Sequence, residues 1–331
     1  MKKKILKITS IILITLLVLL SLLYIITISV YNNFFDVRFT SSSTLKHNLE
    51  DFNNLKRTKY EFKSNNDQTL VGYNYYVENT IPYGLIVMSH GYGGGGHENY
   101  LDVINYFVNN NYTVFAFDVT GNDESEGDSI NGLPQGVIDF DYALRFIKTK
   151  EEFKDLPIML FGHSWGAYSA TNVLNYHNDI KAVVSISGFN ESSDMLKSYG
   201  EKMLGGLVNI ALPIIKTHEK IKFKEYASST SMNGFKNTNT NVMVIHSKDD
   251  EVVAKKYGYD IYQKEYSSSN RFKFIEYENK GHNTIYYSED GINYYNEIIK
   301  SNKKEIDREK WSNLIDKDLF NEIINFYNSS L

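Results

Sequence analysis

The chain has 331 residues, 42% hydrophobic and 23% charged, and a formal net charge of −5. This composition is typical of globular proteins, and the chain is long enough to form a sizeable core. The negative net charge argues against binding of nucleic acid, which requires a basic protein surface. The absence of cysteine excludes disulfides, thiolate metal sites and a cysteine nucleophile.

The first predicted element is a membrane-spanning helix. Four lysines within the first seven residues precede an uncharged run, residues 8–30, dominated by Ile, Leu and Val. The run can cross a hydrocarbon core of about 30 Å, and it is longer than the roughly 7–15 apolar residues of a secretory signal peptide. Because no small-residue cleavage site follows, we predict an uncleaved anchor over residues 1–31, with a cleaved signal peptide as the alternative. The lysines should stay in the cytoplasm, which makes the chain a single-pass protein of the cell membrane whose C-terminal bulk lies outside the cytoplasm.

Residues 32–58 are polar and predict a stalk with a short helix near 45–55, and residues 59–331 predict the globular domain. The domain opens with two alternating segments, Tyr60–Lys63 and Leu70–Val77. Between them stands the turn signal Asn65-Asn66-Asp67. This pattern predicts a β-hairpin.

A regular alternation of buried strands and amphipathic helices follows the hairpin. The predicted strands are 84–89, 113–119, 157–162, 180–187, 241–246 and 271–277, and the predicted helices are 97–109, 135–150, 164–176, 252–266 and 310–327. Such alternation predicts an α/β fold, with a mostly parallel sheet covered by helices on both faces. Residues 188–240 contain no clear strand and read as a helical cap, since an insertion this long is usually functional.

One pentapeptide carries the clearest chemical signal. Gly162-His163-Ser164-Trp165-Gly166 fits the pattern G-x-S-x-G, follows a buried strand and opens a helix. That context is typical of a nucleophile elbow, a sharp turn that exposes a reactive serine above the sheet. In the alternative interpretation, Ser164 only caps the helix.

A serine nucleophile requires a base, and the base requires an acid that orients it. Asp249 and Asp250 follow the predicted strand 241–246, and His282 follows the strand 271–277. The carboxyl ends of parallel strands lie at one edge of a sheet, so these side chains should approach Ser164. Alternatively, the aspartates cap the next helix and His282 is a surface histidine.

An acyl-transfer site also needs N–H groups that bind the developing oxyanion. One should be the backbone N–H of Trp165, and the second should come from the loop after Ser89. The glycines at 93–96 could also suit a phosphate, but no phosphate-binding motif is present. His90, His97 and His163 lie nearby without the spacing of metal ligands, so we expect no metal and no other cofactor.

From about residue 60 to 329 the chain resembles the α/β-hydrolase superfamily, in particular its bacterial membrane-anchored lipase-, esterase- and serine-aminopeptidase-like members. The resemblance rests on four segments: His90-Gly91-Tyr92-Gly93-Gly94, Asp118–Gly127, Gly162–Gly166 and His246–Val253. It implies the α/β-hydrolase fold, Asp250 rather than Asp249 as the acid, and Tyr92 as the second oxyanion donor. The sequence departs from the family pattern at Asp123, Ser247 and Ala254, where the family often has Gly, Gly and Pro.

These features predict a serine hydrolase that cleaves an acyl ester through an acyl-enzyme: Ser164 attacks, His282 moves the proton and Asp250 orients it. The alternatives are a peptidase or amidase with the same triad, an acyltransferase, and a non-catalytic binding scaffold. Carboxylates in the cap, at Glu191, Asp194 and Glu201, could hold the free amine of a peptide. A small molecule, a lipid or a peptide is expected as substrate; the sequence specifies neither the acyl chain nor the oligomeric state.

Overall fold

The computed structural model of the chain describes residues 2–301 and 305–331, apart from the side chain of Leu204. Its centre is an eight-stranded sheet of order β1-β2-β4-β3-β5-β6-β7-β8. The strands are β1 (Lys56–Lys63), β2 (Thr69–Tyr76), β3 (Leu85–Ser89), β4 (Thr113–Phe117), β5 (Ile158–His163), β6 (Ala182–Ile186), β7 (Asn241–Ser247) and β8 (Phe272–Tyr277). The hairpin β1–β2 and the pairing of β2 with β4 are antiparallel, and all other pairs are parallel. The predicted α/β sheet is confirmed.

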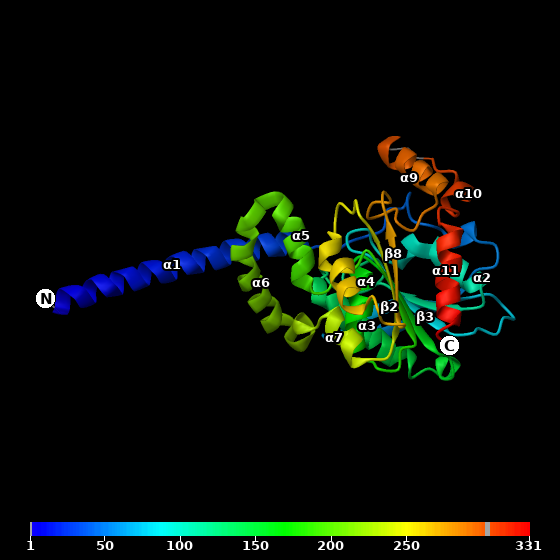
Figure 1. Cartoon of the computed structure of the whole chain (residues 1–331), viewed down its shortest axis with the longest axis horizontal. Coiled ribbons are helices and arrows are strands. Elements are labelled where there is room, and N and C mark those ends of the chain that lie inside the picture. Colours follow the sequence, from blue (N-terminus) through cyan, green and yellow to red (C-terminus); the bar gives the residue numbers. More distant parts are fainter. Residues whose placement is uncertain (1, 302–304) are drawn as a thin grey trace.

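Helices cover both faces of the sheet (Figure 1). One face carries α3 (Leu133–Ile147), α4 (Trp165–Asn172) and α8 (Tyr259–Tyr266), and the other carries α2 (Leu101–Asn109) and α11 (Lys317–Asn328). Each face has its own apolar cluster. Successive side chains of the central strands point alternately into one cluster and into the other. The central strands β3, β4, β5, β6 and β7 are therefore buried on both sides, as their near-continuous apolar sequences require.

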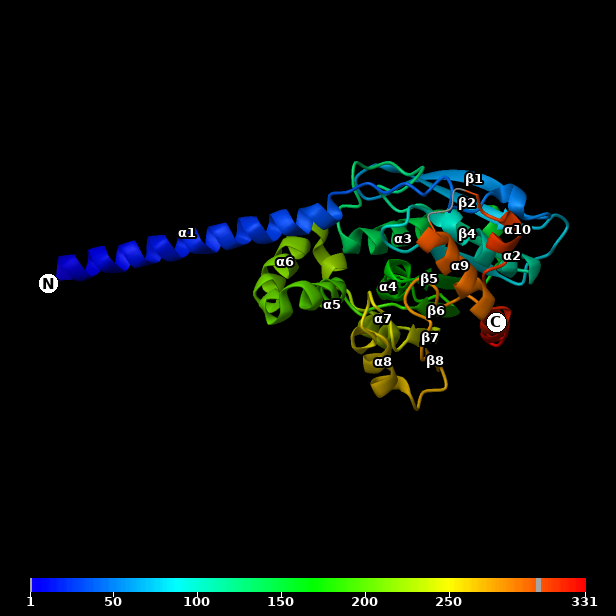
Figure 2. The ribbon, with the colours of Figure 1, turned by 90° about the horizontal axis from the view of Figure 1, so that it is seen from above.

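A cap and a long N-terminal helix extend from this body. The cap between β6 and β7 contains α5 (Ser192–Leu204), α6 (Val208–Phe223) and α7 (Ser231–Asn237). Helix α1 (Lys2–Phe35) passes beside α6 and projects far beyond the body (Figures 1 and 2). It is long and apolar enough to cross a membrane, and only 6% of its most apolar window is buried.

Two predicted helices differ from the structure. The helix predicted at 252–266 begins only at Tyr259, because Asp250 Oδ1 accepts the N–H groups of Val252 and Val253 and holds them in a turn. The helix predicted at 310–327 is divided into α10 (Arg308–Trp311) and α11, whose N-cap is Asp316. A further helix, α9 (Glu289–Ser301), was not predicted.

The segment for which the sequence predicts a stalk lies along the domain. Phe52 and Leu55 are buried, and the side chain of Arg308 forms an ion pair with Asp51. The indole of Trp311 donates a hydrogen bond of 2.8 Å to the carbonyl of Leu45. The helix expected near 45–55 is only a short 3-10 turn at Leu49–Asp51. Contacts with a segment more than 250 residues away, which no local pattern predicts, hold this stretch against the body.

Candidate active site

Ser164 stands in a strained turn between β5 and α4. Its φ of 55° and ψ of −118° are rarely adopted by a residue with a side chain. A Cβ at Gly162 would lie 2.3 Å from backbone atoms of Gly166, and a Cβ at Gly166 would lie 2.1 Å from the carbonyl of Ser89. Both glycines are therefore required for the turn to pack against its own helix and against β3. The strain is concentrated at the residue for which the sequence predicts the nucleophile.

The residues expected to form a triad lie together at the carboxyl edge of the sheet. His282 Nε2 is 2.8 Å from Ser164 Oγ, and His282 Nδ1 is 2.7 Å from Asp250 Oδ2. Both distances are within hydrogen-bonding range. In this arrangement a neutral His282 can accept the serine proton at Nε2 while Nδ1–H donates to the carboxylate.

The Asp250 carboxylate is buried and fully engaged. Its Oδ1 accepts from the N–H groups of Val252 and Val253, at 2.9 and 2.7 Å, and its Oδ2 faces both His282 and, at 3.2 Å, His246 Nε2. Burial alone would raise the pKa of Asp250, but the interactions with His246 and His282 hold it well below its usual range. The carboxylate is therefore a permanent negative charge beside His282.

Asp249, the alternative acid, has a different position. Its Oδ1 accepts from Ser247 Oγ at 2.6 Å and from the N–H of Gly281 at 2.9 Å. Asp249 thus ties the loop after β7 to the loop after β8, whereas Asp250 reaches the imidazole itself. The geometry favours Asp250, in agreement with the resemblance to the family.

Two further groups, to which the sequence analysis gave no role in the triad, hold His282 in place. Glu251 accepts the backbone N–H of His282 at 3.1 Å, and His163 Nε2 is 3.0 Å from the carbonyl of His282. Burial and the neighbouring His282 lower the pKa of His163 to about 3, so this ring is neutral and can donate one N–H to that carbonyl. Its Nδ1 meets the hydroxyl of Tyr100 at 3.0 Å. The only sequence signal for these roles is adjacency to Ser164 and Asp250.

Comparison with known proteins assigns the fold. A family model described as serine aminopeptidase, S33, matches residues 80–231, which include Ser164 and end before Asp250 and His282. An esterase of Pyrococcus furiosus superposes with a TM-score of 0.55 at 16% identity, over 83% of this chain and 91% of that chain. The chain has the α/β-hydrolase fold.

Other solved structures agree with this assignment. The acylaminoacyl peptidase of Pyrococcus horikoshii has a TM-score of 0.57 at 15% identity, over 86% of this chain and 43% of that chain. Acetyl xylan esterase 1 of a Thermoanaerobacterium species has a TM-score of 0.50 at 15% identity, over 70% and 84% of the two chains. A comparison with curated proteins finds no match. Together these findings support a serine hydrolase, either an esterase or a peptidase.

Tyr92 and Trp165, the two residues expected to bind the oxyanion, lie next to each other in this fold. Trp165 is the first residue of α4, so its N–H has no acceptor within the helix. The rings of Tyr92 and Trp165 are in edge contact, with centroids 6.2 Å apart. The Tyr92 hydroxyl donates a 2.6 Å hydrogen bond to the carbonyl of Phe34 at the end of α1. The N-terminal helix therefore touches the loop that is expected to bind the oxyanion.

The remaining histidines near the site have structural partners. His90 lies between the carbonyl of Gly91 and the N–H of Val119, and His97 lies between Asp118 and the hydroxyl of Tyr75. Within the described residues, no group of three or more His, Asp or Glu side chains is arranged to hold a metal ion.

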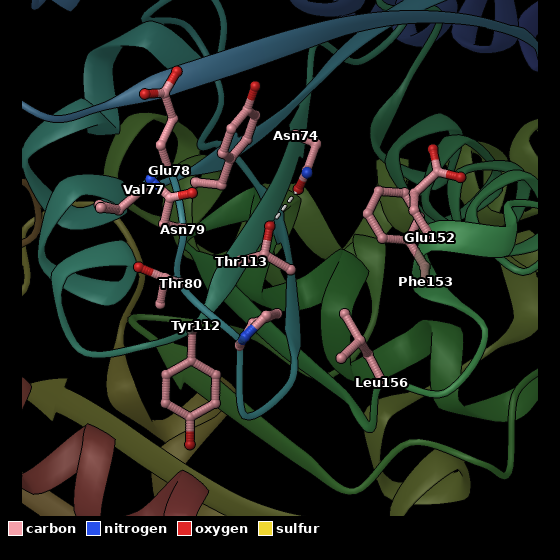
Figure 3. A pocket seen from close by; sticks show the side chains of 12 residues that line it. Asn74, Val77, Glu78, Asn79, Thr80, Tyr112, Thr113, Glu152, Phe153 and Leu156 are labelled. Carbon is pink, nitrogen blue, oxygen red and sulfur yellow. Dashed lines mark hydrogen bonds between the residues drawn. The ribbon is translucent and has the colours of Figure 1, made fainter.

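The triad is covered, because Ser164 and His282 are only 4% and 3% exposed. A hollow of about 360 Å³ lies elsewhere, among residues that include Asn74, Thr113 and Leu156 (Figure 3). Asn74 stands near the end of β2 and Thr113 at the start of β4, so this hollow is at the amino edge of the parallel strands, opposite the triad. Ligands of such sheets bind at the carboxyl edge, and we therefore assign the site to Ser164 and its neighbours.

Proposed function

We propose that this α/β-hydrolase is anchored in the cell membrane by α1, with its catalytic domain outside the cytoplasm, and that it cleaves an acyl ester through an acyl-enzyme. One observation carries the catalytic part: the continuous line from Ser164 Oγ through the His282 ring to Asp250 Oδ2, with steps of 2.8 and 2.7 Å. A scaffold used only for binding has no need of this line or of the strained backbone at Ser164.

The proposed reaction follows from the positions of the atoms. Ser164 Oγ attacks the ester carbonyl while its proton moves to His282 Nε2, and Asp250 stabilises the resulting imidazolium. The tetrahedral oxyanion accepts hydrogen bonds from the backbone N–H groups of Trp165 and Tyr92. On collapse, the proton passes from His282 to the departing alcohol oxygen and the acyl group stays on Ser164. Water then attacks the acyl-enzyme, with His282 again as base, and releases the acid.

The cap favours an ester over a peptide with a free amine. Of the carboxylates that could recognise such an amine, Glu191 is paired with Lys216 at 2.7 Å and Glu201 with Lys256 at 2.9 Å. Asp194 accepts the N–H of Glu191 within a capping box, and burial together with the charge of Glu191 raises its pKa to about 7. None of the three is an unengaged anion, so a cationic substrate group would have to displace an existing partner.

Labelling with a fluorescent fluorophosphonate tests the catalytic proposal. The full-length protein should label, and Ser164→Ala should not, whereas Ser169→Ala, a buried serine of α4 that bonds the carbonyl of Trp165, should label normally. A folded protein that does not label would reject the proposal and favour a binding scaffold. If the enzyme labels but releases its acyl group only to an alcohol or amine acceptor, it is an acyltransferase.

Protease added to intact cells tests the location. The four N-terminal lysines favour an orientation in which the domain is outside. The domain should therefore be digested while the cytoplasmic end of α1 is protected. Protection of the domain would reverse the proposed topology.

A further inference from the structure

Helix α6 of the cap has two apolar faces. Its inner face is buried and includes Val208, Leu212, Ile215 and Phe223. On the opposite side Ile210 and Ile221 are 55% and 76% exposed. Met203 and Leu207, at the turn between α5 and α6, are each 65% exposed. We call these four exposed side chains, Met203, Leu207, Ile210 and Ile221, the outer cap face.

This concentration of exposed apolar side chains is specific to the cap. Outside α1, most large exposed apolar residues in the described part of the chain lie between 199 and 221. The others are Ile81 and Tyr83 in the loop before β3, Ile299 in α9 and Leu331 at the C-terminus. Single exposed apolar residues are normal, but a gathered set indicates a surface that is covered by a partner.

The position of α1 identifies that partner. The hydroxyl of Tyr31 donates a hydrogen bond of 2.9 Å to Glu219 of α6, and the hydroxyl of Tyr24 is 3.5 Å from His218 Nδ1. Helix α6 lies across α1, and in both views it is the part of the body nearest to the N-terminal end (Figures 1 and 2). Because the body lies behind its buried face, the outer cap face is directed along the projecting part of α1.

The free length of α1 matches a bilayer. Residues 5–22 are apolar or uncharged apart from Lys7 and are exposed along the whole stretch, which is about 27 Å at 1.5 Å per residue. A hydrocarbon core is about 30 Å thick. A membrane spanned by this stretch would therefore end where α6 crosses the helix.

The charges around the outer cap face fit a lipid surface. Lys220 of α6 and Lys224, the residue that follows its last turn, are exposed and form no ion pair among the residues that the structure describes, whereas Lys216 pairs with Glu191. Lysines beside an apolar helix face are typical of helices in the membrane interface, where they meet anionic headgroups.

The same region leads to the covered triad. Phe34 of α1 is in edge contact with Tyr199 of α5, at a centroid distance of 6.4 Å, and its carbonyl accepts the hydroxyl of Tyr92. Tyr92 in turn contacts Trp165, the residue after Ser164. The contact between anchor and cap is thus separated from the nucleophile turn by a single side chain.

We propose that the outer cap face rests in the outer leaflet of the membrane that α1 spans, and that the enzyme takes its acyl ester from that leaflet, between α1 and α5. The substrate is then a membrane-resident amphiphile rather than a solute. This inference rests on the proposed function and adds to it a substrate class and a route of entry.

Lipid contact can be measured without catalysis. The full-length Ile210→Trp variant is placed in vesicles of phosphatidylcholine and phosphatidylglycerol, with and without brominated acyl chains, beside the control Ile81→Trp. Both native tryptophans are buried and give the same background in each variant. Bromine should quench the tryptophan fluorescence of the Ile210→Trp variant and not that of the Ile81→Trp variant. Equal quenching of the two would overturn the lipid contact.

The substrate route is tested by the double variant Ile210→Asp, Ile221→Asp, with Ile81→Asp as the control. Hydrolysis of a long-chain monoacylglycerol held in the vesicles should fall by about tenfold or more, because two apolar side chains no longer enter the leaflet. Hydrolysis of a soluble short-chain nitrophenyl ester should not change. An unchanged rate on the vesicle ester would overturn the route.

The two proposals fail in different ways. If the protein labels with fluorophosphonate and cleaves the soluble ester but not the vesicle ester, the inference about the substrate is wrong and the proposed hydrolase remains. If it neither labels nor cleaves either ester, the proposed function itself is wrong.

Discussion

The fold shifts the pKa values of two buried carboxylates in opposite directions. One carboxylate lies at the catalytic edge and the other lies between cap and anchor. Asp250 receives two backbone N–H groups and faces two imidazole rings, and these interactions outweigh burial and keep its pKa well below the usual range. Glu219, 1% exposed, accepts hydroxyl groups from Tyr31 and Ser192, and burial raises its pKa to about 7.

The difference lies in the donors. Groups that can carry positive charge, as the two histidines beside Asp250 can, hold an anion in a dry site, whereas neutral hydroxyls compensate burial only in part. Asp250 is therefore suited to a fixed charge that orients His282. Glu219 is suited to a contact that changes its protonation near neutral pH.

The largest expected effect is at the ring beside Asp250. His282→Gln should lower kcat/KM on a soluble nitrophenyl ester by about 10⁴-fold or more, because Ser164 loses its base. The matched control is His177→Gln, since His177 also bonds a buried aspartate, Asp141 of α3, at 2.8 Å, but takes no part in the triad. If both variants lost activity equally, His282 would have no special role.

The next largest effect separates the two aspartates. Asp250→Asn should lower kcat by about 10³–10⁴-fold, because an amide in place of the carboxylate favours the wrong tautomer of His282 and removes the charge. Asp249→Asn keeps an oxygen for Gly281 and should cost about tenfold or less. A larger loss of kcat in Asp249→Asn than in Asp250→Asn would identify Asp249 as the acid.

The sequence predicts the catalytic edge better than the cap, and the reason is locality. The sheet could be predicted because its central strands are short apolar runs bounded by polar turns and its hairpin strands alternate. Ser164, Asp250 and His282 each stand in the turn or loop that follows a strand, and parallel strands bring their ends to one edge. Their catalytic roles stay predictions until the variants are measured.

The parts that were not predicted depend on contacts between distant segments. Tyr31 and Glu219 are 188 residues apart, and the ion pair of Asp51 with Arg308 spans 257 residues. No periodicity relates such positions. The helix expected from residue 252 is delayed by a tertiary contact as well as by the turn at Asp250. A Cβ at Gly258 would lie 2.3 Å from the carbonyl of Gly188, so the chain there packs closely against the loop after β6.

Glu219→Gln tests the comparison of the two carboxylates through the pH dependence of the free energy of unfolding. A carboxyl whose pKa rises from 4.5 to about 7 on folding binds more protons in the folded state, so its stabilising effect is present at acidic pH and is lost as pH rises through about 7. Between pH 4 and 8 the free energy of unfolding of the native protein should fall, relative to the variant, by up to about 3 kcal/mol.

Denaturant unfolding of both proteins in detergent, at several pH values, measures this difference. Asp102 and Asp194 also have pKa values raised to about 7, but they are present in both proteins and cancel. The neighbouring charges of Lys222 and Glu191 are likewise unchanged. A difference that does not vary with pH would mean that Glu219 keeps one protonation state throughout.

Tyr31→Phe should have the smallest effect, and it tests whether the anchor itself stabilises the cap. The variant removes one of the two hydroxyls that donate to Glu219 and leaves the ring packed against Phe35, at a centroid distance of 4.6 Å. A lost hydrogen bond to a buried group costs about 1–2 kcal/mol. Tyr24→Phe, on the exposed side of the same helix, should cost less than about 0.5 kcal/mol. The cost at Tyr31 should also grow above pH 7, where an ionised Glu219 has more need of a donor. Equal costs for the two tyrosines would show that the cap is held by its own packing and that α1 only lies beside it.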